Sequence, residues 1–169
     1  YNFVQDPTKS FAEIINNAQI ISKSYVGLLA AGIINRAEIT ANLGSVALSS
    51  GKAATLDFSG DGLINFSIAE SVDGKVVGVD GKEKDAGINN SNLIQADGGR
   101  VVLSIKSAQE VAGNVINNTG IIEARSVQKR DGRVFLQAQG SGTVLNEGKI
   151  DVSSIEKKVN AGICLLYTS

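Results

Sequence analysis

The residues of this chain that could do chemistry are aspartates placed beside glycines. Asp57 and Asp61 flank the Ser59-Gly60 turn, and four further aspartates each precede a glycine directly: Asp73, Asp80, Asp97 and Asp131. Carboxylates of this kind could ligate calcium, or could cleave a polysaccharide if two of them faced the same sugar. An Asp-Gly dipeptide is first of all a turn former, so any chemistry depends on whether these aspartates converge on one face of the fold.

The absence of histidine removes several classes of enzyme. The chain contains no His, so it has no Ser-His-Asp triad, no histidine-ligated zinc and no histidine general base. The calcium pattern is also incomplete, because Gly98-Gly99 is followed by Arg100 and Val101, with no acidic residue in phase as in Gly-Gly-x-Gly-x-Asp repeats. We therefore expect no catalytic residue, no metal and no cofactor.

The positions that we predict to face outward hold no column of acidic residues. They are Ser45, Ala47, Arg100, Val102, Arg133 and Phe135. Arg100 and Arg133 occupy the same place in the repeat described below, where they could line an outer face or could be ordinary solvated residues. Polysaccharide lyases and hydrolases with a β-helix fold need an acidic cluster and a basic residue on one outer face. We therefore expect that the protein is not an enzyme.

These side chains are positioned by a repeat with the pattern Asn-x-x-x-Ile-x-small. Its asparagines, 18, 55, 28 and 28 residues apart, are Asn17, Asn35, Asn90, Asn118 and Asn146. Its isoleucines are Ile21, Ile39, Ile94, Ile122 and Ile150. A period of this length is typical of a stacked array of strands. Because 55 is close to two periods of 28, we expect a disguised copy in the long gap, with Gly62 replacing the asparagine and Phe66-Ser67-Ile68 supplying the strand.

Each apolar position of the repeat predicts one interior column of side chains. In a parallel stack each strand lies about 4.8 Å from its equivalent, so a residue type that recurs once per period meets itself. The five isoleucines form one such core column, and Ile94 should pair with Ile122 and Ile122 with Ile150. We expect Ile122→Asp to destabilise the fold badly, and Arg125→Ala, at the start of an exposed corner, to be tolerated. Two roles are open for the asparagines: corner residues that only shape a turn, or a ladder of amide hydrogen bonds.

Composition and charge set further bounds. The 16 basic and 17 acidic residues nearly cancel and are mixed along the chain, whereas nucleic-acid binding requires a face of positive charge. The single cysteine, Cys164, cannot form an internal disulfide and leaves the cellular compartment open. No apolar stretch is long enough to span a bilayer as a helix.

The repeat also predicts how the chain is organised. Residues 1–159 form one β-helix fragment, with an insertion or hairpin near residues 72–87, where charged and turn residues are frequent. Residues 160–169 match no repeat position and resemble the translated adapter sequences at the ends of assembled environmental reads, which would make them foreign to the protein. Because the chain contains no Met, we interpret it as an internal piece of a longer protein.

Three blocks of the chain resemble the N-terminal region of filamentous haemagglutinin-like exoproteins of two-partner secretion. The blocks are Asn42 to Leu48 (NLGSVAL), Ala54 to Ile64 (ATLDFSGDGLI) and Val115 to Gly120 (VINNTG), and the resemblance covers about Tyr1 to Ser154. It implies an all-β fold, a right-handed single-stranded parallel β-helix (β-solenoid). It also implies export through a dedicated outer-membrane transporter, and adhesion from the surface of a Gram-negative-type bacterium. The Asn-Pro-Asn motifs of the family are absent, since Pro7 follows Asp6.

The sequence therefore supports one main hypothesis and two rivals. The main hypothesis is a structural and adhesive β-helix segment of a large secreted or surface-exposed adhesin. Its partners are the outer-membrane transporter, in the full-length protein, and surface glycans or proteins of other cells, but no nucleic acid. The first rival is a carbohydrate-active β-helix enzyme of the lyase or hydrolase type, and the second is a roll stabilised by calcium.

Overall fold

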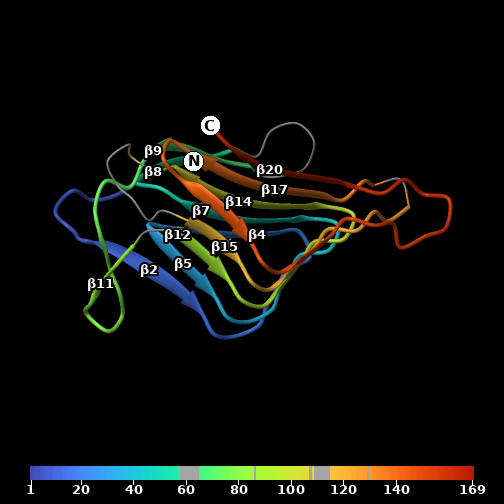
Figure 1. The fold of residues 1–169 in the computed structure, drawn as a ribbon, viewed down its shortest axis with the longest axis horizontal. Helices are drawn as coiled ribbons and strands as arrows, with labels where there is room; N and C mark the ends of the chain where they lie inside the picture. The colour runs from blue at the N-terminus through green and yellow to red at the C-terminus, as the bar shows by residue number, and fades with distance from the viewer. Residues whose placement is uncertain (58–64, 86, 107, 109–114, 129) are drawn as a thin grey trace.

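The fold is all-β. The computed structural model describes residues 1–57, 65–85, 87–106, 108, 115–128 and 130–169, and within these ranges every regular element is a strand. No helix in the described part of the chain is long and apolar enough to cross a membrane. The strands form four sheets, three of which are visited in rotation as the chain advances (Figure 1).

The first of the three rotating sheets, which we name the asparagine sheet, has the strand order β11-β10-β2-β5-β12-β15-β18. Its five strands from the repeat are β2 (Phe11–Asn16), β5 (Gly32–Asn35), β12 (Gly87–Asn90), β15 (Val115–Asn118) and β18 (Thr143–Asn146). These five pair in parallel, each with the equivalent strand of the next pass of the chain.

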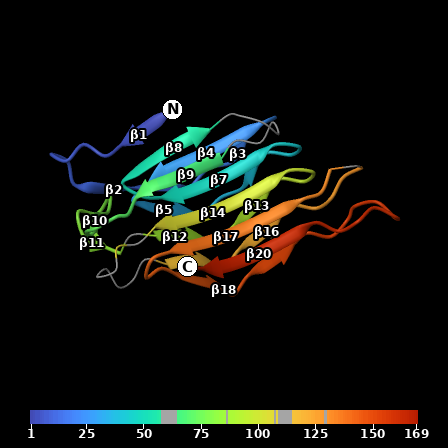
Figure 2. The same cartoon turned by 90° about the horizontal axis from the view of Figure 1, so that it is seen from above.

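The second sheet, which we name the short-strand sheet, has the order β19-β16-β13-β6-β3. Its strands are β3 (Ile20–Ile21), β6 (Ile39–Thr40), β13 (Leu93–Gln95), β16 (Ile121–Glu123) and β19 (Lys149–Asp151). The third, the long-strand sheet, has the order β20-β17-β14-β7-β4. Its strands are β4 (Tyr25–Ala30), β7 (Ser45–Ser50), β14 (Arg100–Lys106), β17 (Arg133–Gln139) and β20 (Ile163–Thr168). All pairings within these two sheets are parallel, and successive passes lie side by side in Figure 2.

The core lies between the three rotating sheets and consists of apolar residues that repeat in register. Ile94 pairs with Ile39 on one side and with Ile122 on the other, and Ile122 pairs with Ile150, as the 28-residue spacing predicts. Valine and leucine columns run beside them in the long-strand sheet. The members of these columns with no exposed surface are Ile39, Ile94, Ile122, Val46, Val101, Val134, Leu48, Leu103 and Leu136. Burial of this kind stabilises the fold by about 25 cal/mol per Å² of apolar surface removed from water.

The first isoleucine of the core column is Ile20, and the prediction of Ile21 is wrong. Ile20 pairs with Ile39. Ile21 points to the opposite face of the strand and is 68% exposed. The pairs Asn16-Asn17 and Ile20-Ile21 fit the four-residue spacing equally well in two registers. A slip of one residue turns every side chain of a strand to the opposite face, so the register that buries Ile20 is selected.

The described residues of the long gap form no disguised copy of the repeat. β5, β6 and β7 pair directly with β12, β13 and β14, so one pass follows the other in space. Phe66-Ser67-Ile68 lies in β9 (Asn65–Glu70), which pairs antiparallel with β8 (Ala53–Asp57), and β8 pairs antiparallel with β1 (Asn2–Val4). Gly62 lies outside the described residues. The extra length therefore makes a separate three-stranded sheet, which we name the outer sheet.

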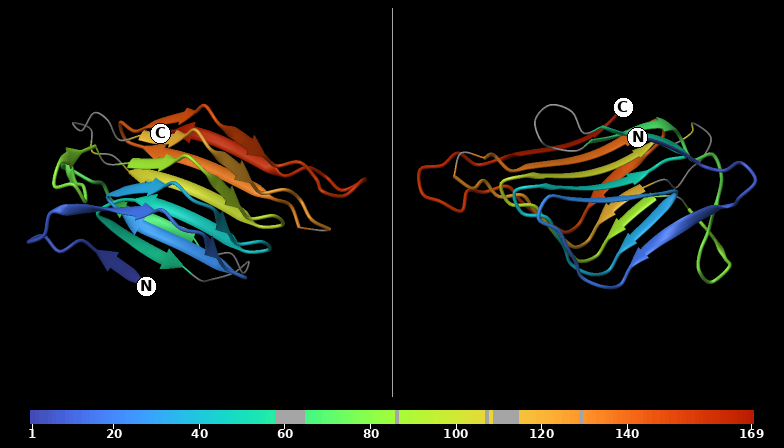
Figure 3. Two further views of the ribbon diagram at one scale, coloured as in Figure 1. Left: turned by 90° about the horizontal axis from the view of Figure 1, so that it is seen from below. Right: turned by 180° about the vertical axis from the view of Figure 1, so that it is seen from behind.

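The outer sheet lies against the long-strand sheet. β9 is close to β7 and β14, and Figures 1 and 3 both show β8 and β9 beside the long strands. Ala47 and Ser49 alternate with the core residues of β7 and so face away from the core, yet they are 1% and 0% exposed. One face of the long-strand sheet is thus covered, which the outward assignment of Ala47 did not foresee.

Residues 72–87 contain a small hairpin. Its strands β10 (Val76–Val77) and β11 (Glu83–Lys84) are antiparallel, and β10 also pairs in parallel with β2. The hairpin therefore continues the asparagine sheet beyond its first strand, where Val76 and Val72 bury against Ala31 and Phe11.

The last residues belong to the long-strand sheet, although the repeat predicted that residues 160–169 lie outside it. β20 pairs in parallel with β17, so that Cys164 lies beside Val134 and Leu166 beside Leu136. Cys164 and Leu166 are two residues apart and occupy the register positions of the valine and leucine columns, so the segment extends these two columns without the asparagine pattern.

Candidate functional site

The asparagines form a continuous ladder of hydrogen bonds. Asn16 Nδ2 donates to Asn35 Oδ1 at 2.8 Å, and the same contact links Asn35 to Asn90 at 2.8 Å, Asn90 to Asn118 at 2.7 Å and Asn118 to Asn146 at 2.7 Å. Asn35 and Asn118 have no exposed surface. A buried amide needs partners for its donor and its acceptor, and each asparagine supplies them to the next.

The ladder begins at Asn16, so the assignment of Asn17 is wrong for the same reason as that of Ile21. Asn16 ends β2 and pairs with Asn35 in register, which leaves Asn17 exposed beyond the strand. The other four predicted asparagines, Asn35, Asn90, Asn118 and Asn146, are all members of the ladder.

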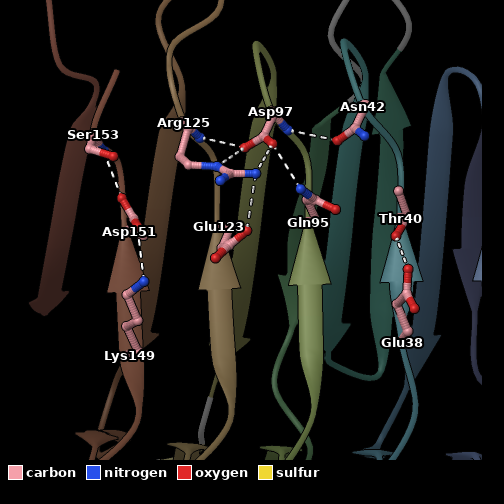
Figure 4. Close-up of polar contacts among 10 residues, drawn as sticks. All are labelled: Glu38, Thr40, Asn42, Gln95, Asp97, Glu123, Arg125, Lys149, Asp151 and Ser153. Atoms are coloured by element: carbon pink, nitrogen blue, oxygen red, sulfur yellow. Dashed lines mark hydrogen bonds and ion pairs between the residues drawn. The ribbon is translucent and has the colours of Figure 1, made fainter. Parts of the chain in front are cut away.

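A second set of polar residues lies on the outward face of the short-strand sheet and is the candidate functional site (Figure 4). Thr40, Gln95, Glu123 and Asp151 share one register position there. Two residues further along the chain come Asn42, Asp97, Arg125 and Ser153. We name these eight residues the polar band.

The centre of the polar band is an ion pair between Asp97 and Arg125. Arg125 Nε donates to Asp97 Oδ1 at 3.1 Å, its Nη2 donates to Asp97 Oδ2, and its backbone N–H donates to Oδ1 at 2.9 Å. Gln95 Nε2 donates to Asp97 Oδ2 at 2.8 Å, and Glu123 Oε2 lies 3.3 Å from Arg125 Nη2. The side chain of Asp97 is only 8% exposed, so these donors replace the water that it lacks.

This geometry corrects the expectation for Arg125. We predicted an exposed residue whose removal would be tolerated, but the side chain of Arg125 is only 29% exposed and its guanidinium group neutralises a buried carboxylate. The partner is Asp97, one full pass earlier in the chain, and the repeat pattern does not specify contacts between outward side chains of successive passes.

Hydrogen bonds lower the pKa of two carboxylates of the polar band, Asp97 and Asp151. Burial raises the pKa of Asp97, but the hydrogen bonds from Arg125 and Gln95 outweigh burial and bring the pKa below its usual range. Hydrogen bonds from Ser153 and then Lys149 lower the pKa of Asp151 to about 2. Both groups are therefore hydrogen-bond acceptors at neutral pH and cannot act as general acids, which require a raised pKa.

Of the four aspartates on which catalysis or calcium binding would depend, the three that the structure describes are found in different places. Asp57 ends β8 of the outer sheet, Asp97 lies in the polar band, and Asp131 is exposed in the corner before β17. Asp61 lies outside the described residues. Among the described residues no group of three or more His, Cys, Asp or Glu side chains could hold a metal ion.

Two of the other aspartates form exposed ion pairs. Asp73 lies 3.3 Å from Lys52, and Asp80 lies 3.5 Å from Lys84. The contact of Asp80 lies within the β10–β11 hairpin, in line with the turn-forming role of Asp-Gly, whereas that of Asp73 joins two segments 21 residues apart.

Sequence reasoning missed the acidic neighbours Glu123 and Asp151. Each directly follows a core isoleucine, Ile122 or Ile150, so both lie at the same outward position of the repeat. The residue that follows each isoleucine of the core column would have revealed them. The outward positions that we compared for acidic residues lie on the long strands instead. There Arg100 and Arg133 do pair in register, but Arg100 is only 9% exposed and is not an ordinary solvated residue.

Comparison of the chain with protein-family models, with curated proteins and with solved structures gives no match in any of the three.

Proposed function

We propose that this chain is a structural and adhesive segment of a large secreted exoprotein, folded as a right-handed, single-stranded parallel β-helix. The observation that carries this proposal is the asparagine ladder, which passes from Asn16 to Asn146 through all five strands of the repeat in the asparagine sheet. A buried row of amides gives nothing to catalysis. It does hold successive passes in register, which is the requirement of a long, rigid rod.

The resemblance to filamentous haemagglutinin-like exoproteins supplies the biological context of the proposal. In that context the full-length protein is exported by an outer-membrane transporter of two-partner secretion and stays at or near the cell surface. The segment then displays its outward faces to the surfaces of other cells.

The polar band is the face that we propose for adhesion. It combines the carboxylates of Asp151 and Glu123 with the donors Arg125 and Gln95 on one sheet face. Side chains that are already fixed by hydrogen bonds lose little conformational freedom on binding. A surface of this kind suits ligands rich in hydroxyl groups, which donate and accept hydrogen bonds, and cell-surface glycans are such ligands.

The proposal can be tested with fluorescently labelled protein and cultured epithelial cells. We expect saturable binding that is lost when surface glycans are removed enzymatically. The double variant Glu123→Gln with Asp151→Asn should weaken binding, because both residues lie in the band and neither is in the core. Thr143→Ala, an exposed residue on the asparagine sheet, is the control and should bind as the parent does. Binding that survives both deglycosylation and the double variant would exclude the polar band as the adhesive face.

One observation favours a carbohydrate-active enzyme as the second candidate. Glu123 and Asp151 occupy paired positions on adjacent parallel strands, whose spacing of about 4.8 Å is near the separation of about 5 Å between the carboxyl groups of retaining glycosidases. The low pKa of Asp151 suits a nucleophile but not the acid that must protonate the leaving group. Release of sugars from a panel of neutral and acidic polysaccharides, abolished by either Glu123→Gln or Asp151→Asn, would establish this candidate in place of the structural one.

A further inference from the structure

A cavity of about 220 Å³ lies between the β10–β11 hairpin and the asparagine sheet, away from the polar band. Gly32 and Gly87, which pair in register on β5 and β12, form part of its lining. Ile34 and Val76 give it apolar surface, and Asn89 and Asp85 are exposed residues at its edge. The three strands β2, β5 and β12 and the hairpin that line it belong to different parts of the chain, and Figure 1 shows the hairpin beside β2.

Because glycine has no side chain, Gly32 and Gly87 leave the backbone of the sheet accessible from the cavity. Close packing of the neighbouring backbone requires glycine at only one of the two positions. A Cβ on Gly87 would come within 2.5 Å of the carbonyl oxygen of Val115, so the close approach of two strands demands glycine there. A Cβ on Gly32 would meet nothing nearer than Val76 Cγ1 at 3.4 Å, an ordinary contact. Gly32 is the first residue of β5 and an alanine would fit there, so the space above it is room that packing alone does not require.

A nearly buried carboxylate points to a polar occupant. The side chain of Glu13 is 3% exposed and accepts hydrogen bonds from Lys84 Nζ at 3.2 Å and from the backbone N–H of Val79 at 3.0 Å. Asn89 contributes a second polar group, and its side-chain amide makes no hydrogen bond to any described part of the chain. The cavity thus offers both a charged pair at one side and a free donor and acceptor at the other.

The charges around the cavity nearly cancel, which selects a neutral ligand. Lys84 faces the carboxylates of Glu13 and Asp80, and Asp85 pairs with Lys75. The ammonium group of Lys84 is already neutralised by these carboxylates, so it offers little attraction to a negatively charged ligand. A positively charged ligand would compete with Lys84 for Glu13. Hydroxyl groups, by contrast, can donate to Glu13 or Asp85 and exchange hydrogen bonds with Asn89 without any change of charge.

The size of the cavity sets the size of the ligand. A cavity of about 150 Å³ is enough to hold a benzene ring, so 220 Å³ admits one six-membered ring with hydroxyl substituents. The apolar surface of Ile34 and Val76 can pack against the C–H groups of such a ring. We propose that this cavity binds a single neutral pyranose, the terminal hexose of a glycan.

The test uses the full 169-residue chain labelled with ¹⁵N and titrated with the methyl glycosides of galactose, mannose and glucose. We expect at least one of them to shift the backbone amide resonances of Gly32, Gly87 and Asn89. Methyl glucuronide, which carries a carboxylate, should not. An array of oligosaccharides with the same terminal hexoses, attached through their reducing ends, then shows whether the sugar is taken as the end of a glycan or only free in solution.

Two variants separate the cavity from the rest of the fold. Asn89→Ala removes the free amide and should weaken the affinity for the responding sugar roughly tenfold, as expected for loss of a well-placed hydrogen bond. Gly32→Ala places a methyl group in the cavity without a clash and should weaken the affinity at least as much. Asn117→Ala is the matched control, since Asn117 occupies the same register position on β15 outside the cavity.

The outcomes distinguish this inference from adhesion through the polar band. Hexoside shifts that are lost in Asn89→Ala and kept in both Asn117→Ala and the Glu123→Gln, Asp151→Asn variant support the cavity whatever the cell-binding result. The inference would be overturned by the absence of any shift with a neutral hexoside, by a preference for the glucuronide, or by an affinity in Asn89→Ala and Gly32→Ala equal to that of the parent. None of these results would bear on the polar band.

Discussion

Asn90 donates a hydrogen bond from Nδ2 to Oδ1 of Asn118 at 2.7 Å, although the two residues are 28 positions apart in the chain. The contact repeats from pass to pass, so each asparagine inside the ladder is both donor and acceptor. Because these amides are buried, breaking one rung leaves two polar groups without water or protein partners.

Asn118→Leu should therefore destabilise the protein by about 2 kcal/mol, because the buried amide donor of Asn90 loses its partner at about 1–3 kcal/mol, whereas the acceptor of the exposed Asn146 can turn to water. Asn146→Ala is the comparison, since Asn146 ends the ladder, is exposed and shares only one rung. It should cost about 1 kcal/mol. Urea denaturation measures the free energy of unfolding of both variants. Equal losses of stability would mean that the asparagines act only as turn residues and that their hydrogen bonds do not stabilise the fold.

Adjacent isoleucines on β16 give a test of the core assignment. Ile122 is fully buried, whereas its neighbour Ile121 is 41% exposed on the opposite face. Ile122→Asp should unfold the protein or cost several kcal/mol, because an unpaired carboxylate would enter the core. Ile121→Asp should change the stability by less than about 1 kcal/mol. Comparable denaturation midpoints in the two variants would show that the register of β16 is wrong.

The sequence predicted the strands of the later passes well, for a physical reason. Ile94, Ile122 and Ile150 meet in register because a period of 28 residues brings equivalent positions together. The first pass failed because Asn16-Asn17 and Ile20-Ile21 satisfy the pattern in two registers, and only packing against Ile39 chooses between them.

The rest of the candidate site could not be read from the sequence. The pairing of Asp97 with Arg125 depends on which outward residues of successive passes come side by side, and the inward pattern does not determine that. In the same way, the 55-residue gap is as long as two periods but contains only one pass of the repeat. The antiparallel strands β8 and β9 of the outer sheet account for extra residues. Spacing alone does not distinguish another pass from an outer sheet.

Arg125→Ala should destabilise the protein, in contrast to removal of an exposed arginine. The change leaves the carboxylate of Asp97, 8% exposed, without its charge partner, which costs about 1–3 kcal/mol for a buried acceptor. Arg36→Ala, at an exposed position, is the control and should stay within about 0.5 kcal/mol of the parent. Both values come from urea denaturation at neutral pH, and a neutral effect of Arg125→Ala would show that water replaces the guanidinium group.

The pH dependence of stability should report the ionised carboxylates of the polar band. The folded pKa of Asp151 is about 2, below its ordinary value of 3.8, so its stabilising effect is present above pH about 4 and is lost as the pH falls toward 2. Asp97, whose pKa is also lowered, acts in the same direction. The urea midpoint of the parent should thus fall on acidification from pH 5 to about 2. In Asp151→Asn the fall should be shallower, and an identical pH profile would exclude Asp151 as a contributor.

Removal of residues 160–169 should destabilise the protein, even though the repeat pattern did not include them. β20 pairs with six residues of β17 and covers Val134 and Leu136, both fully buried, whereas Leu166 on the last strand is 41% exposed. Without β20 the end of the core and the unpaired edge of β17 would face water. An exposed apolar edge of this kind also pairs with other chains.

We therefore expect the protein truncated after Val159 to have a lower melting temperature and to self-associate at concentrations where the parent is monomeric, as measured by analytical ultracentrifugation. Leu166→Ala in the full chain is the control, because it keeps the backbone pairing of β20 and removes only a half-exposed side chain; it should lower the melting temperature far less. A truncated protein that melts and sediments like the parent would mean that β20 does not stabilise the fold, and the repeat pattern would then mark the true end of the folded segment.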